Sequence, residues 1–166
     1  MDRPEIDWDD THAFTTGTVG PRGRRVFFLQ ARHTDQVVSL KLEKQQVAGL
    51  AEFLDKMLND LPPVPGGESD NAADEAEFDD PGEPDWVIGN LGVTYHQSSD
   101  RLVLFVEELV RDEDVQPAHA RFPLSRAQVV AFVARARMLI EAGRDPCPLC
   151  GAPLDPAAKG WCPCVN

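Results

Sequence analysis

The chain has 166 residues, 28 of them acidic and 16 basic, so its formal net charge is −12. This length suits one domain or two very small ones, and it is enough to bury a core without disulfide bonds. An acidic protein does not attract phosphate backbones, which argues against a general nucleic-acid coat. The sequence has no long apolar run and no signal-like N-terminus, so we expect a cytoplasmic protein that does not span a membrane.

A first unit of three strands and a helix is predicted over residues 10–61. Turn-forming residues separate the strands, and the third strand alternates apolar with polar residues, as a half-buried strand does. Apolar residues at helical spacing then predict a helix, and Glu43 and Gln46 stand where a capping box would begin it. The predicted strands are 14–19, 25–32 and 36–42, and the predicted helix is 44–61.

The segment 62–85 follows, and it is acidic and rich in proline and glycine. Residues 59–85 contain ten of the acids and no lysine or arginine, which leaves the rest of the chain near neutral. Proline and glycine interrupt regular structure and like charges repel, so we interpret 62–85 as a disordered linker. An acidic arm that docks on a basic surface is the alternative, with Phe78 as its only aromatic anchor.

A second unit over 86–143 repeats the pattern of the first. The sequence aromatic-x-x-Gly-x-aliphatic-Gly occurs at 14–20 and again at 86–92, and two further short matches follow in the same order. Three matches in register predict a duplicated unit. Ser125 and Gln128 form a capping box before the second helix. The predicted strands are 86–95, 101–110 and 118–122, and the predicted helix is 126–142.

All four cysteines lie in the tail, residues 144–166. Cys147 and Cys150 have the spacing of a zinc knuckle, because two intervening residues let both thiolates face one ion. Cys162 and Cys164 are separated by one residue, which is shorter than usual. We expect a structural Zn²⁺ held by all four, since four thiolates leave no open position for a catalytic water.

A group of arginines at the start of the chain is the candidate anion site. Its members lie on the second predicted strand and the turn before it, where a phosphate or a nucleic acid could be held on the paired strands. The alternative is that these charges keep an exposed strand edge from pairing with other chains, or that they bind the acidic linker. The residues are Arg22, Arg24, Arg25 and Arg32.

Three segments carry a family resemblance: 14–20, 25–32 and 147–156. They resemble an actinobacterial family of uncharacterised repeat proteins with a Cys-Pro-x-Cys-Gly tail. The resemblance spans nearly the whole chain and implies a zinc-ribbon-like tail, but no activity. The usual tail has a histidine shortly before Cys162, which is absent here, and an arginine where this chain has Cys164.

Together these features predict an α+β fold of two pseudo-repeated β-β-β-α units with an antiparallel sheet, plus a C-terminal zinc knuckle. We expect a non-enzymatic binding or adaptor module with a protein partner. One alternative is an enzyme or a nucleotide- or phosphate-binding protein that uses the cleft between the units and the arginine group. The other is a nucleic-acid binder that uses the zinc tail and the second helix, with Arg135, Arg137 and Arg144.

Overall fold

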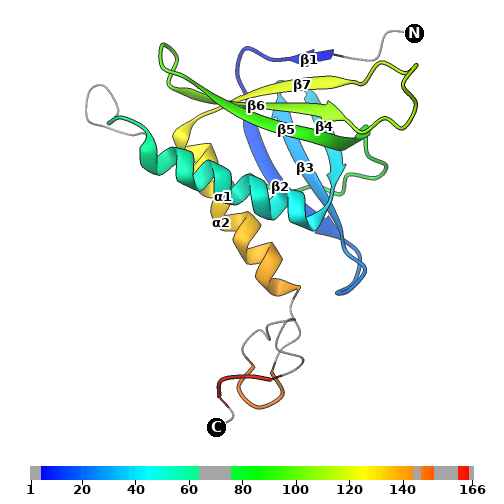
Figure 1. The fold of residues 1–166 in the computed structure, drawn as a ribbon, viewed down its shortest axis with the longest axis vertical. Coiled ribbons are helices and arrows are strands. Elements are labelled where there is room, and N and C mark those ends of the chain that lie inside the picture. The colour runs from blue at the N-terminus through cyan, green and yellow to red at the C-terminus, as the bar shows by residue number, and fades with distance from the viewer. Residues whose placement is uncertain (1–4, 64–75, 144–146, 152–160, 165–166) are drawn as a thin grey trace.

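Seven strands form one sheet in the computed structural model, which describes residues 5–63, 76–143, 147–151 and 161–164. The strand order across the sheet is β1-β7-β6-β5-β4-β3-β2 (Figure 1). The strands are β1 (Glu5–Asp7), β2 (Ala13–Val19), β3 (Val26–His33), β4 (Gln36–Leu42), β5 (Trp86–His96), β6 (Arg101–Glu108) and β7 (His119–Leu124). The helices are α1 (Lys44–Asp60) and α2 (Arg126–Ala142).

The predicted elements are present with bounds that agree to within about two residues, the usual uncertainty of element ends. Apart from β1, each half of the chain runs strand, strand, strand, helix, as expected, and both predicted capping boxes begin their helices. The mixed α+β class is confirmed, whereas the duplication and the division into domains stay predictions. β1 was not predicted; it is three residues long and pairs with β7.

The strands within each predicted unit are antiparallel, as expected, but the two groups join in parallel, so the sheet as a whole is mixed. β2, β3 and β4 form one antiparallel group and β5, β6 and β7 form another, but β4 and β5 are parallel. The physical reason is the connection between the two groups. The chain leaves β4, passes through α1 and a long segment, and re-enters the sheet beside β4 in the same direction, as parallel neighbours require.

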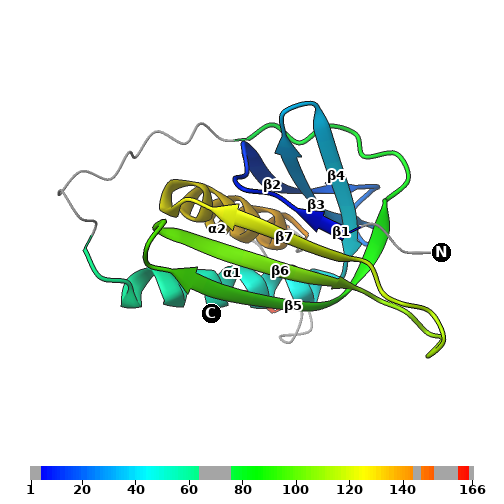
Figure 2. The ribbon, with the colours of Figure 1, turned by 90° about the horizontal axis from the view of Figure 1, so that it is seen from above.

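A single hydrophobic core lies between the sheet and the two helices. The sheet curves around the helices (Figure 2), which pack against each other, and α2 also packs on β2. Buried side chains from both halves meet in this core, among them Leu29, Leu54, Leu104 and Phe132. Neither half would bury enough apolar surface alone, because three strands and one helix form only a thin layer.

Residues 76–85, which we call the strap, lie against the sheet and differ from the disordered linker predicted over 62–85. The Asp79 backbone is hydrogen-bonded to Gln30, and the Asp85 N–H donates to the Ser39 carbonyl oxygen at 2.8 Å. Phe78 faces Phe28 with ring centroids 6.4 Å apart, and its ring lies against Gly17. Residues 64–75 of the predicted linker lie outside the described residues.

Candidate metal centre

The first half of the centre is a tight turn that carries Cys147 and Cys150. Gly151 closes it with a positive φ of 76°, a conformation that glycine adopts without the cost of a Cβ. The Gly151 N–H donates to the Cys147 carbonyl oxygen at 2.9 Å. This is the knuckle that the Cys-x-x-Cys-Gly sequence predicts.

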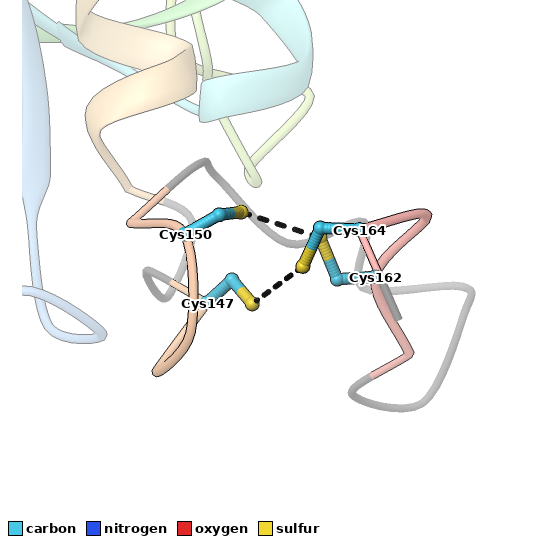
Figure 3. Close-up of side chains that lie close together, drawn as sticks. All are labelled: Cys147, Cys150, Cys162 and Cys164. Carbon is cyan, nitrogen blue, oxygen red and sulfur yellow. Dashed lines mark hydrogen bonds between the residues drawn. The ribbon is translucent and has the colours of Figure 1, made fainter. Parts of the chain in front are cut away.

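The second half brings Cys162 and Cys164 opposite the knuckle (Figure 3). The Sγ atoms of Cys147 and Cys164 are 3.6 Å apart, as are those of Cys150 and Cys162, and all four lie within 4.8 Å of one another. A tetrahedral metal with bonds of about 2.3 Å would place sulfur atoms roughly 3.8 Å apart. No disulfide joins them, and the four cysteines can hold a metal ion.

The charges that the four thiols would carry when ionised also favour the binding of a cation. Backbone hydrogen bonds from Cys150 and Leu149 lower the pKa of the Cys147 thiol to about 6. Hydrogen bonds with the thiols of Cys162 and Cys150 raise the pKa of Cys164. Four thiolates at this spacing disfavour one another's ionised form, because like charges repel. A divalent cation would supply the missing charge, and its binding would release the protons.

The centre is half-covered by its own chain and lies beyond the end of α2, away from the sheet (Figure 1). Cys147 and Cys162 are buried, whereas Cys150 and Cys164 are exposed. Two large apolar side chains next to the ligands face solvent: Leu149 is 74% exposed and Trp161 is 57% exposed.

A family model described as "protein of unknown function (DUF3090)" matches residues 6–162. The chain belongs to this family. Comparisons with curated proteins and with solved structures give no match. The match includes the strap and the first three cysteines and ends at Cys162, so Cys164 lies outside it.

The structure does not gather the candidate anion-site arginines into one place. Arg25 directly precedes β3 and Arg32 lies near its other end, roughly 23 Å away at about 3.3 Å per residue. Arg25 donates from Nη1 to the Leu139 carbonyl oxygen at 2.6 Å and lies over the Phe27 ring, while Arg32 pairs with Asp79. Arg22 and Arg24 are exposed in the β2–β3 turn.

The arginines of α2 are also occupied within the chain. Arg135 donates from Nε to the Thr16 carbonyl oxygen at 2.7 Å, and Arg137 pairs with Asp55 of α1 at 3.0 Å. Arg144, the third member of the predicted nucleic-acid surface, lies outside the described residues. Arg135 and Arg137 therefore hold α2 to its neighbours.

Neither described helix is long and apolar enough to cross a membrane.

Sequence reasoning missed a stack of rings at the N-terminal loop. The ring of His33 lies between those of Trp8 and His12, with centroid distances of 5.3 and 4.7 Å. His33 Nδ1 is 2.8 Å from the Asp10 carbonyl oxygen, and the Thr34 N–H donates to His12 Nδ1 at 2.9 Å. Nothing in the sequence spacing of the two histidines indicates that they stack.

The different environments of two neighbouring arginines lead to a stability prediction. Arg25→Met removes the hydrogen bond to the last turn of α2 and a favourable charge at its C-terminal end, which together are worth about 1–2 kcal/mol. Arg24→Met makes the same charge change at an exposed turn position and should shift stability by less than about 0.5 kcal/mol. Urea unfolding followed by circular dichroism measures both; equal effects would contradict a structural role for Arg25.

Proposed function

We propose that the chain is a zinc-binding protein whose tail serves as a non-enzymatic contact module. The observation that carries this proposal is the approach of the four Sγ atoms to within 4.8 Å of one another, with two pairs at 3.6 Å, close to the edge of roughly 3.8 Å in a tetrahedral thiolate site. The ligands would be Cys147, Cys150, Cys162 and Cys164.

The ligand set favours Zn²⁺ in a structural role. Four thiolates are soft ligands that suit zinc, and a tetrahedral site filled by sulfur keeps no position for a substrate or an activated water. Such a site contributes its binding free energy to local folding. We place the protein in a reducing compartment such as the cytoplasm, because the thiols must stay reduced to bind the metal.

The contact role rests on the two apolar side chains that flank the ligands. Leu149 lies inside the knuckle and Trp161 directly precedes Cys162, so each half of the centre presents one of them. A metal that joins the halves also fixes these two side chains relative to each other. Tryptophan is enriched at the centres of protein interfaces, so the partner we propose is a protein.

The enzyme and nucleic-acid alternatives have less support. Both rely on arginines, and Arg25, Arg32, Arg135 and Arg137 are engaged by acceptors of the chain itself. A guanidinium that is already paired gains less from an incoming phosphate, because the existing contact must first be broken.

Metal analysis tests the zinc site. We expect untagged, reduced full-length protein to contain one zinc ion per chain, and Cys150→Ser to lose most of it. Cys164→Ser tests the irregular half of the centre and should weaken zinc binding, which a competition titration with a chromogenic chelator measures. Less than about half an equivalent of zinc in fresh protein with free thiols would overturn the assignment.

Site-specific photo-crosslinking tests the contact role. A crosslinking amino acid at position 161 should trap a discrete protein in cells, and the Cys150→Ser change should abolish the product, since the two halves of the centre then separate. Position 138 is the matched control, because Met138 is 58% exposed on α2, close to the 57% of Trp161. Identical products from positions 161 and 138, or none from 161, would contradict the proposal.

A further inference from the structure

The outer face of β2, β3 and β4 carries a row of polar side chains that point away from the core. Thr15 pairs with Gln30 and Gln30 with Ser39 in the strand register, so the three lie side by side. Their exposed fractions are only 3%, 1% and 6%, although neither α1 nor α2, the helices of the described residues, lies on this face. The strap runs along this face (Figure 2) and is hydrogen-bonded to Gln30 and to Ser39.

Gln30 contacts the backbone of the strap rather than its side chains. The Asp79 N–H donates to Gln30 Oε1 at 3.0 Å, and Gln30 Nε2 donates to the Asp79 carbonyl oxygen at 3.2 Å. The same Nε2 donates to Ser39 Oγ at 3.2 Å, which holds the amide in place. The buried side chain of Gln30 thus pairs with both the N–H and the carbonyl group of Asp79, as a neighbouring strand would. These bonds do not depend on which side chain that position carries.

Side-chain selectivity comes from the positions on either side of Gln30. The Phe78 ring lies on the Cα of Gly17, where any Cβ would overlap the ring. The Phe28 ring lies beside it, and we call the position between Gly17 and Phe28 the notch. Arg32 pairs with the Asp79 carboxylate. Gly17 and Phe28 face each other across the register of β2 and β3, so the notch is built by the strands themselves.

We infer that this face is a peptide-recognition site, occupied in the resting protein by the chain's own Phe78-Asp79. The ligand class is an extended protein segment in which an aromatic residue is followed by an aspartate. A segment of that kind from a partner would bind by displacing the strap. The site is separate from the described part of the cysteine tail, because none of the contacts given above involves residues 147–151 or 161–164.

The strap contacts are of a kind that a competitor can replace. The ion pair is open to solvent, with side-chain exposures of 31% for Arg32 and 61% for Asp79, so it is screened and weak. Phe28 and Gln30 belong to the outer face, and the hydrophobic core on the other side of the sheet does not include them. The strap is favoured mainly because it is tethered, which gives it a high effective concentration.

A binding experiment with the free strap sequence tests the inference. The probe is a fluorescent peptide of residues 76–85, and the receptor is the full-length Phe78→Ala variant, whose tethered strap lacks the anchor. We expect this variant to bind the peptide at least about tenfold more tightly than the wild type does, as measured by fluorescence anisotropy. A peptide with alanine in place of the phenylalanine keeps the same charge and should bind neither protein.

Two glycine substitutions make the test specific to the notch. Gly17→Ala, added to Phe78→Ala, should abolish peptide binding, because the methyl group occupies the position of the ring. Gly92→Ala is the matched control on β5, since a Cβ there meets nothing within 4 Å, and it should leave binding unchanged. Folding of each variant is checked by circular dichroism.

The inference is overturned if folded Phe78→Ala fails to bind the peptide at millimolar concentration, or if Gly17→Ala and Gly92→Ala have the same effect. Equal binding of the two peptides would also overturn it, because it would show attraction by charge alone. If Phe78→Ala does not fold, Asp79→Ala takes its place, since it removes only the exposed ion pair. No gain in peptide binding by that variant over the wild type would count equally against the site.

Discussion

The pairing of β4 with β5 is the contact on which both halves of the fold depend. Only Leu40 with Trp86 and Lys41 with Val87 pair in register, yet this short junction makes one sheet from two three-stranded groups. Without it, neither group could share the core that mixes side chains from both. Asp85 extends the junction, because its N–H donates to the Ser39 carbonyl oxygen and its carboxylate accepts the Ser39 N–H at 2.9 Å. The last residue of the strap therefore sets where β5 begins.

The fold explains where part of the chain's unevenly distributed negative charge lies. Most of the net charge of −12 belongs to residues 59–85, and part of that acidic segment lies on the sheet. Asp79 meets Arg32, so one member of the arginine group contacts the acidic segment instead of an external anion. The strap site and the cysteine tail are separate surfaces, one organised by strand register and the other by the ligand chemistry of four thiols.

The parts of the structure that were predictable are those with a local signal. The helices carry apolar residues at helical spacing, and the Ser125–Gln128 capping box is visible in the sequence and present in the structure. The cysteine cluster is likewise signalled by its spacing. β1 was not predictable, because three residues carry too little pattern and their partner β7 lies far along the chain. The parallel pairing of β4 with β5 was not predictable either, since a half-buried strand shows the same alternation of apolar and polar residues in parallel and antiparallel pairs. Gln30 stood out only as one polar residue among apolar neighbours, and its partner Asp79 is 49 residues away.

Residue-resolved amide hydrogen exchange of the wild-type chain tests the central claim, that the strap is part of the folded sheet. The two informative amides are those of Asp79, which donates to Gln30, and Asp85, which donates to Ser39. We predict that both exchange on the order of a hundredfold more slowly than in a free peptide of the same sequence, because each must break a hydrogen bond to a buried partner before it opens. Exchange of both amides at the rate of the free peptide would contradict the docked strap and, with it, the peptide site and the role of Asp85 at the junction.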